Sequence, residues 1–317
     1  MTVHDGSSSG VAALEDTGYR QRCRDGDERE GGFTDHESGE PMIALEDVAV
    51  SFGDQAVLEG VDLAVGRGEV VGLIGPNGSG KTTLIRTISG VLQPDDGRVV
   101  VDGTPIHELS SRAASRLIAV VPQRTTLEFA FDVRQIVEMG RTPHRGRFEA
   151  PTPHDLGMVE RALEATNVAD MAGRSIDEVS GGERQRVLLA RAIAQETPAV
   201  LLDEPTASLD INHQVETLEL VRSLVGTDRA VLAAIHDLNL AARFCDRLVL
   251  LGDGAVVARG PPETVLAPDR LETVFDTWTT VARNPVTNTP SVTAHARGRA
   301  EHWSDGSHPS TMDDPPD

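Results

Sequence analysis

The residues best suited to chemistry lie in one glycine-rich segment that ends in Gly80-Lys81-Thr82. A glycine, four further residues and then Gly-Lys-Thr form the pattern of a phosphate-binding loop. Glycines adopt backbone angles that other residues resist, so successive amide groups can point inward at a phosphate. Lys81 is the only lysine in the chain. We expect its compact ammonium to bind the β and γ phosphates of a nucleotide, and Thr82 to bind Mg²⁺.

The segments on either side of this loop have the patterns of a strand and a helix. Val70–Ile74 is a short apolar run typical of a strand buried on both faces, and residues 82–88 follow with helical spacing. The N-terminal end of that helix adds positive potential where the phosphates would lie. A chance match in a glycine-containing turn is the alternative, and the flanking strand and helix disfavour it. The predicted ATP-binding residues here are Gly75, Pro76, Asn77, Gly78, Ser79, Gly80, Lys81, Thr82 and Thr83.

Two adjacent carboxylates, Asp203 and Glu204, end a second apolar run, residues 199–202. Neighbouring residues of a strand point to opposite sides, so these two acids cannot have the same role. Asp203 suits the outer coordination of Mg²⁺, and Glu204 is then free to orient or deprotonate an attacking water. The alternative is that both acids only cap a strand on the solvated rim of a sheet.

A second glycine turn opens another helix at Ser180-Gly181-Gly182-Glu183. The N-terminus of a helix that follows such a turn has the geometry of an anion site. The first loop already accounts for one nucleotide. A second anion site therefore needs either another ligand or another copy of the chain.

Taken together, these motifs resemble those of ATP-binding cassette (ABC) proteins. Residues 179–185 resemble the signature motif of that family, with Val179 in place of its usual leucine and Glu183 in place of a frequent glutamine. The resemblance extends over residues 43–275. The remaining motifs occur in the order of the family, with Gln123 as the Q-loop glutamine, Ser208-Leu209-Asp210 as the D-loop and His236 as the switch histidine.

This resemblance implies a head-to-tail homodimer with two ATP molecules at its interface. Each ATP would be held by the phosphate loop of one subunit and by the signature turn of the other. The residues implied to bind that second side of ATP are Ser180, Gly181, Gly182, Glu183 and Asp210.

The resemblance also assigns the catalytic residues and the Mg²⁺ ligands. Glu204 would polarise the water, His236 would contact the γ-phosphate, and Gln123 is the third catalytic residue. Phe52 is implied to stack on adenine, with a core position in a strand as the alternative. The implied cofactors are ATP and Mg²⁺, and the residues implied to hold the metal are Thr82, Gln123 and Asp203.

The expected fold class is α/β, an ABC ATPase core of the P-loop NTPase type with a parallel sheet. An antiparallel β subdomain precedes the core, and an α-helical subdomain is inserted at about residues 124–191, where strand patterns are absent. Residues 1–40 are expected to form a disordered acidic leader and residues 41–275 the ATP-binding domain. Residues 276–317 are expected to form a tail that contains a weak hairpin and then disorder.

Composition limits the classes of protein further. A formal net charge of −21 argues against nucleic acid as a partner, because phosphate backbones attract the opposite sign. No run approaches the roughly 20 apolar residues of a membrane-spanning helix, and the acidic N-terminus lacks a secretory signal, so we expect a soluble cytoplasmic chain.

Cys23 and Cys245 are expected to be free thiols. An acidic surface with one lysine resembles proteins from salt-rich cytoplasm, with an ordinary acidic surface as the alternative.

Within the ABC family, the ATPase subunit of an importer is the favoured class. A G-protein-type GTPase would need an Asn-Lys-x-Asp motif, which a chain whose only lysine is Lys81 cannot contain. Cassettes of translation or DNA repair normally have two cassettes or a long coiled-coil insertion, and this sequence has neither. An export cassette remains open as an alternative.

Three segments, 133–144, 208–214 and 236–246, resemble the branch that imports iron-siderophore, haem and cobalamin. Archaeal cobalamin import ATPases are the most similar, although the longer C-terminal extension that they often have is absent here. The implied partners are two separate transmembrane permease subunits and an external substrate-binding protein, which place the chain at the cytoplasmic face of the membrane. Residues 129–147 are the predicted permease contact, and packing within the helical subdomain is the alternative.

Overall fold

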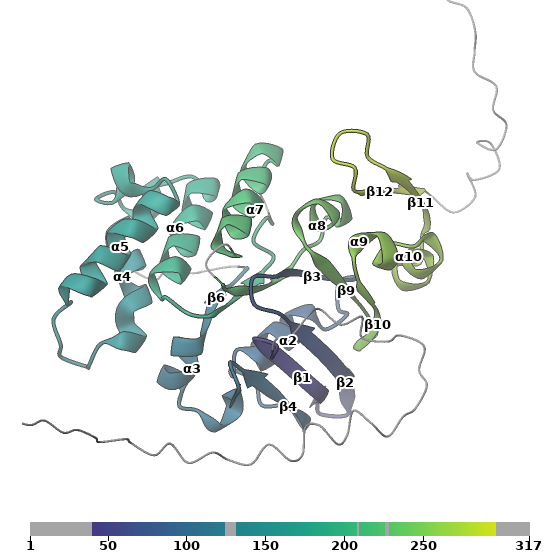
Figure 1. The fold of residues 1–317 in the computed structure, drawn as a ribbon, viewed down its shortest axis with the longest axis horizontal. Coiled ribbons are helices and arrows are strands. Elements are labelled where there is room, and N and C mark those ends of the chain that lie inside the picture. The colour runs from purple at the N-terminus through teal and green to yellow at the C-terminus, as the bar shows by residue number, and fades with distance from the viewer. Residues whose placement is uncertain (1–39, 124–130, 208, 226–227, 296–317) are drawn as a thin grey trace, which may run out of the picture. The chain divides into compact units, whose positions relative to one another are not determined.

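The computed structural model describes residues 40–123, 131–207, 209–225 and 228–295 (Figure 1). These residues belong to one compact unit, Gly39–Asp317, and the description below refers to that unit. Apart from Glu40, the predicted leader lies outside the described residues, as do Cys23 and the tail from residue 296 onward.

The central sheet has six strands in the order β10-β9-β3-β8-β7-β6. All of them except β10 run parallel, and β10 pairs antiparallel with β9. Every residue of β3, β7 and β8 is buried, which explains their uninterrupted apolar runs. The strands are β3 (Val70–Ile74), β6 (Ile118–Val121), β7 (Ala199–Asp203), β8 (Ala230–Ala234), β9 (Arg247–Gly252) and β10 (Ala255–Gly260).

A second sheet is antiparallel and has the strand order β2-β1-β4-β5. A turn at Gly53-Asp54 joins its first two strands, so that Phe52 and Gln55 face each other. Apolar side chains of this sheet share one cluster with Val71 and Leu73 of β3. The strands are β1 (Ile43–Phe52), β2 (Gln55–Val65), β4 (Asp96–Val101) and β5 (Thr104–Pro105).

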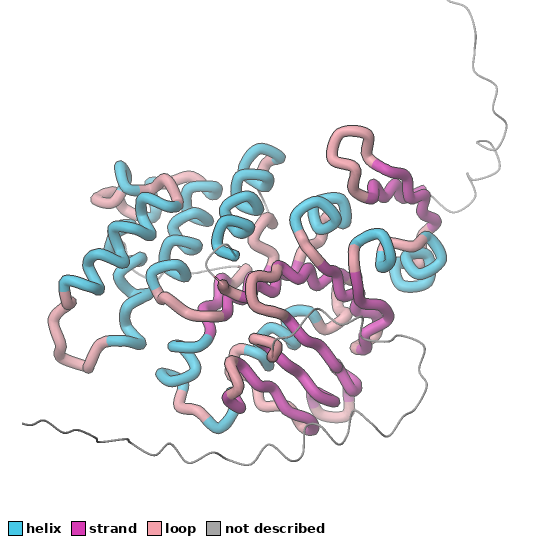
Figure 2. Tube along the Cα trace, in the orientation of Figure 1, coloured by secondary structure: helices cyan, strands magenta, loops and turns pink. Residues whose placement is uncertain are grey.

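A helical segment follows β6 and precedes β7 along the chain, where the sequence predicts an inserted helical subdomain. Figure 2 shows its helices as a group of cyan coils. It has an apolar cluster of its own, which includes Val133, Leu163 and Val187. Its helices are α4 (Val133–Glu138), a 3₁₀ turn (Met139–His144), α5 (Pro153–Ala165) and α6 (Gly181–Ala194), with shorter 3₁₀ turns at Ala169–Met171 and Ile176–Glu178.

The remaining helices complete the two faces of the central sheet. One face packs with α2 and the antiparallel sheet, and the other packs with residues of α6, α7 and α8. These helices are α2 (Lys81–Ile88), α3 (Ser111–Leu117), α7 (Ile211–Val225), α8 (Leu238–Phe244), α9 (Pro262–Val265) and α10 (Pro268–Phe275), with a 3₁₀ turn at Ile106–Glu108. The strands β11 (Trp278–Arg283) and β12 (Pro290–His295) pair antiparallel in the segment where the sequence predicts a hairpin.

The fold class predicted from the sequence is confirmed, with a parallel sheet, an antiparallel sheet and an inserted group of helices. The sequence reasoning did not identify β10, although Asp253-Gly254 between β9 and β10 is a typical hairpin turn. The thiol of Cys245 is free and buried, and burial raises its pKa to about 12. No helix in the described part of the chain is long and apolar enough to span a membrane.

Candidate nucleotide-binding site

The phosphate loop joins the end of β3 to the start of α2, as its sequence pattern predicts. Gly75 and Gly80 have φ angles of 152° and 100°, a region that residues with a Cβ rarely adopt. Space also requires glycine at both positions. A Cβ on Gly80 would lie 2.7 Å from Leu58 Cδ2, and one on Gly75 would collide with the carbonyl oxygen of Leu251.

Lys81 is the first residue of α2, and only 5% of it is exposed. Its ammonium donates to the carbonyl oxygens of Gly75 and Pro76, both at 2.8 Å. Burial lowers the pKa of Lys81, while the charges of Glu204 and Asp203 raise it. A buried ammonium bonded to neutral carbonyls gains strongly from an anionic ligand.

The hydroxyl of Ser79 is buried in the same loop and has no hydrogen-bond partner among the described residues. An unsatisfied buried polar group costs about 1–3 kcal/mol, which a ligand oxygen would recover. Together with the ammonium of Lys81, this hydroxyl makes the loop suited to bind a phosphate.

Thr82 and Asp203 form a pair of oxygen donors beside the loop. The Thr82 hydroxyl donates to Asp203 Oδ1 at 3.2 Å. Burial raises the pKa of Asp203, and the hydrogen bond from Thr82 partly opposes this shift. A hydroxyl and a carboxylate are ligands that Mg²⁺ prefers, so the donor set fits the predicted metal.

Glu204 lies directly after β7, with its backbone in the left-handed region at φ 53°. This conformation costs a residue with a side chain about 1–3 kcal/mol, and such strain is common at functional sites. Gln123 Nε2 donates to one oxygen of the Glu204 carboxylate, and His236 Nε2 contacts the other. The structure therefore brings the three predicted catalytic residues together.

The strand order explains this convergence. Gln123, Glu204 and His236 follow the ends of β6, β7 and β8, which are neighbouring parallel strands. In parallel α/β sheets, ligands bind outside the carboxyl ends of the strands. The phosphate loop follows β3, the next strand beyond β8, so all four segments lie at one edge of the sheet.

The predicted signature turn forms the start of α6 and holds itself in place. Ser180 is the N-cap, and its hydroxyl accepts a hydrogen bond from the backbone N–H of Glu183 at 3.3 Å. In return, the Glu183 carboxylate accepts from the backbone N–H of Ser180 at 2.7 Å, which lowers its pKa. This reciprocal capping box stabilises the turn, and it means that the Glu183 side chain caps the N-terminus of its own helix.

Asp210 makes its contacts with the first turn of α7. Its Oδ1 atom accepts from the backbone N–H of His213 at 2.9 Å and lies 2.7 Å from His213 Nδ1. These bonds lower the pKa of Asp210. Ser208 of the predicted D-loop lies outside the described residues. Sequence reasoning gave His213 no role in the site, although a histidine three residues after Asp210 in a helix was an available signal.

Phe52 lies at the end of β1, where 54% of it is exposed. A core position is therefore excluded, and the ring is free to contact a ligand. Replacing Phe52 with alanine is expected to weaken ATP binding roughly tenfold, because stacking on a base contributes about 1–3 kcal/mol. Folding stability should change by less than about 0.5 kcal/mol, as is usual for a surface substitution. Nucleotide titration and thermal unfolding of the same variant test this, and unchanged affinity would remove Phe52 from the site.

The predicted contact segment, residues 129–147, is described from Phe131 onward. Much of it packs inward, because Val133, Ile136 and Val137 are buried in the core of the helical segment. Its exposed part includes Arg147, whose guanidinium lies over the ring of the neighbouring Phe148. Packing within the helical subdomain, the alternative from the sequence, therefore applies to the buried residues, and the permease contact stays a prediction for the exposed ones.

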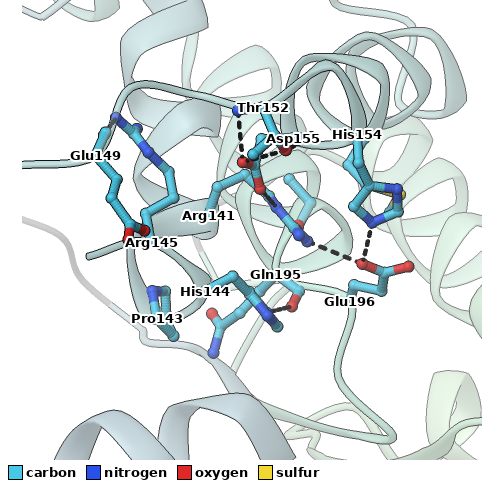
Figure 3. A network of polar contacts seen from close by, with 12 residues as sticks. Arg141, Pro143, His144, Arg145, Glu149, Thr152, His154, Asp155, Gln195 and Glu196 are labelled. Atoms are coloured by element: carbon cyan, nitrogen blue, oxygen red, sulfur yellow. Dashed lines mark hydrogen bonds and ion pairs between the residues drawn. The ribbon is translucent and has the colours of Figure 1, made fainter.

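Arg141 is the centre of a buried polar network within this segment (Figure 3). It is 3% exposed, and its Nε donates to Asp155 Oδ1 at 2.9 Å. Its Nη1 donates to the carbonyl oxygen of Ala194 at 2.8 Å and to Glu196 Oε2 at 3.1 Å. Thr152 donates to the same Asp155 carboxylate from its hydroxyl and its backbone N–H. The network joins the 3₁₀ turn, the start of α5 and the end of α6.

The last residues of the same 3₁₀ turn are hydrogen-bonded to neighbouring elements. Arg112 and Arg116 of α3 donate to the carbonyl oxygen of Pro143 at 3.0 and 2.9 Å. His144 Nε2 contacts the carbonyl oxygen of Gln195 at 2.8 Å, as Figure 3 shows. This part of the helical segment is therefore joined to both α3 and the end of α6.

The site combines a strand, a glycine loop and a helix with two carboxylates at the end of another strand of the same sheet. These features define a nucleotide-binding protein of the P-loop class. Residues 58–207 match the ABC transporter family. The chain belongs to this family, since it also covers the full length of a relative with which it is 42% identical.

Three similar curated proteins are named as ATP-binding proteins of import or transport systems. The chain is 52% identical over 245 residues to the cobalamin import ATP-binding protein BtuD of Halobacterium salinarum, which covers 77% of this chain and 61% of that protein. It is 42% identical to the hemin import ATP-binding protein HmuV of Pseudomonas aeruginosa, over 80% of this chain and 100% of that one. It is 37% identical to the probable siderophore transport ATP-binding protein YusV of Bacillus subtilis, over 82% and 95%.

The chain spans 61% of the length of the Halobacterium relatives. Among solved structures, it is similar to one described as a metal-chelate type ABC transporter in an inward-facing conformation, with a TM-score of 0.72 and 26% identity over 81% of this chain and 98% of that one. It is also similar to a bacterial ABC transporter cassette solved as a dimer, with a TM-score of 0.62 and 28% identity over 70% and 99%.

Proposed function

We propose that the chain is the ATPase subunit of an ABC importer and hydrolyses ATP in a head-to-tail dimer. The observation that supports this most directly is the Glu204 carboxylate, held between Gln123 and His236 next to the phosphate loop. This arrangement supports a role for Glu204 as the base that acts on water next to a γ-phosphate.

The residues of the site divide the chemistry among them. Lys81 and the loop amides bind the phosphates, and Thr82 with Asp203 would hold Mg²⁺, which would supply neutralising charge. Glu204 orients the attacking water and accepts its proton, and His236 keeps the carboxylate aimed at that water.

The signature turn is proposed to act on the ATP of the partner subunit. Its backbone begins α6, so the helix N-terminus offers N–H groups and positive potential to the far side of the phosphates. The similarity to a cassette solved as a dimer supports this assembly. Ser180 and Gly181 of the signature turn are exposed, which supports their contact with a second subunit.

Cobalamin is the cargo that we propose, because the Halobacterium proteins named for it are 52% identical. Haem or a ferric siderophore is the second candidate, and the relatives named for those cargoes support it equally. The similar metal-chelate type transporter fits all three.

The proposed partners are two separate transmembrane permease subunits and an external substrate-binding protein. The ATPase would then be peripheral, at the cytoplasmic face of the membrane, and the exposed part of residues 131–147 would contact a permease. Copurifying the tagged chain with its permease and binding protein tests this proposal. A corrinoid on the binding protein would support cobalamin, haem or a siderophore would select the second candidate, and purification without a permease would contradict the importer function.

Activity is expected to depend on salt. At a net charge of −21 the chain repels itself, and 1 M salt reduces the screening length to about 3 Å. We expect ATPase activity to be lost at low ionic strength and recovered in concentrated KCl. Sucrose at equal osmolarity is the control, since it screens no charge, and activity indifferent to salt would contradict the expectation.

A further inference from the structure

The N-terminal ends of α6 and α7 meet where Gly182 faces the ring of His213. A Cβ on Gly182 would lie 2.8 Å from Cγ and 3.0 Å from Nε2 of that ring, and closer still to Cδ2. The backbone of Gly182 is not in the left-handed region, so the ring, rather than the backbone, requires glycine here. At Gly181 a Cβ would meet nothing within 4 Å. The two glycines therefore face different surroundings.

The same ring is bound to Asp210. His213 Nδ1 lies 2.7 Å from Asp210 Oδ1, the oxygen that also accepts the backbone N–H of His213. The His213 side chain is 33% exposed, so it lies at the boundary of the two helices rather than in the apolar core. One imidazole thus connects the signature turn to the residue that precedes α7.

A second contact joins the two helices one turn further along. Glu216 Oε2 accepts from Arg186 Nη1 at 2.9 Å, and its Oε1 accepts from Asn212 Nδ2 at 2.7 Å. The apolar residues of α6 and α7 also share one cluster. The ion pair and the apolar cluster hold the helices together along their length. The contacts of His213, by comparison, are with Gly182 and Asp210 at the N-terminal ends of the helices.

We propose that His213 is a positioning residue of the composite ATP site, one that fixes Asp210 relative to the signature turn so that both meet the nucleotide of the partner subunit together. This inference rests on the proposed function. Gly181, where a Cβ would lie within 4 Å of no other described residue, is then the glycine open to the partner's ATP, and Gly182 is the glycine that packs against the ring.

The test uses the full chain with Glu204→Gln, in which slow hydrolysis lets an ATP-bound dimer accumulate. His213→Phe keeps a ring against Gly182 and removes the Nδ1 donor. Losing a hydrogen bond to a charged group should raise the ATP concentration for half-maximal dimerisation about tenfold. Binding of a fluorescent ATP analogue to the monomer should change less than about twofold, because His213 does not touch the phosphate loop. Light scattering and fluorescence titration measure the two quantities.

Two further variants separate positioning from packing. His213→Asn keeps a donor at the position of Nδ1 and should recover most of the dimerisation. Glu216→Ala is the matched control, because it removes the ion pair between Arg186 of α6 and Glu216 of α7. It should lower the melting temperature without changing the ATP concentration for half-maximal dimerisation.

Dimerisation of His213→Phe at the parent's ATP concentration would overturn the inference. Equal losses in the phenylalanine and asparagine variants, with lowered melting temperatures, would also overturn it, because they indicate packing alone. If the Glu204→Gln parent binds ATP but never dimerises, the dimer mechanism fails and the inference with it. If the parent does not bind ATP, the proposed function itself fails.

Discussion

Replacing Glu204 with glutamine is expected to lower the rate of ATP hydrolysis by a factor of about 10² to 10⁴, the usual contribution of a positioned general base. Glutamine keeps the size of the side chain and can still hydrogen-bond to Gln123, but it cannot accept a proton from water. The phosphate loop is untouched, so ATP should bind and trap the dimer. Phosphate release measures hydrolysis, and light scattering with ATP measures the dimer.

Lys81→Ala is the contrasting variant, because it removes the only buried ammonium among the described residues of the loop. We expect it to abolish turnover through loss of nucleotide binding, whereas Glu204→Gln loses turnover and keeps binding. Full activity of Lys81→Ala would contradict the phosphate-loop assignment. A Glu204→Gln variant that stays monomeric with ATP would contradict the dimer mechanism.

Features encoded within a few consecutive residues could be predicted from the sequence. The phosphate loop needs glycines, one lysine and a threonine at fixed spacing, and the strand that ends in Asp203 is apolar throughout. Local patterns therefore located β3, α2 and β7. Lys81 and Asp203 could be proposed as site residues for the same reason.

Contacts between distant segments could not be predicted in this way. The sequence suggested roles for Gln123 and His236, but not that both contact the carboxylate of Glu204, because that contact follows from the order of β6, β7 and β8. The left-handed backbone of Glu204 has no local signal either, since glutamate, unlike asparagine and aspartate, is not a residue type enriched in this conformation. The pairing of His213 with Gly182 likewise depends on how α6 packs against α7.

The buried network around Arg141 could not be predicted for the same reason, and it gives the largest expected effect on stability. Replacing Arg141 with methionine is expected to lower the free energy of unfolding by about 3–5 kcal/mol, because the buried Asp155 loses its charged partner. Each kcal/mol shifts the melting temperature of a domain of this size by about 2–4 °C, so a decrease of roughly 10 °C should be seen by calorimetry.

Arg134→Met is the matched control, since Arg134 pairs with Glu160 on the surface of the same helical segment and should contribute less than about 1 kcal/mol. The pH dependence gives a second measurement. Hydrogen bonds from Thr152 and Arg141 hold the pKa of Asp155 below its ordinary value despite its burial. Its contribution is present above that ordinary value, about 3.8, and is lost as the pH falls further. Arg141→Met should therefore lose less stability on acidification than the parent, and equal melting temperatures for both arginine variants would contradict the prediction.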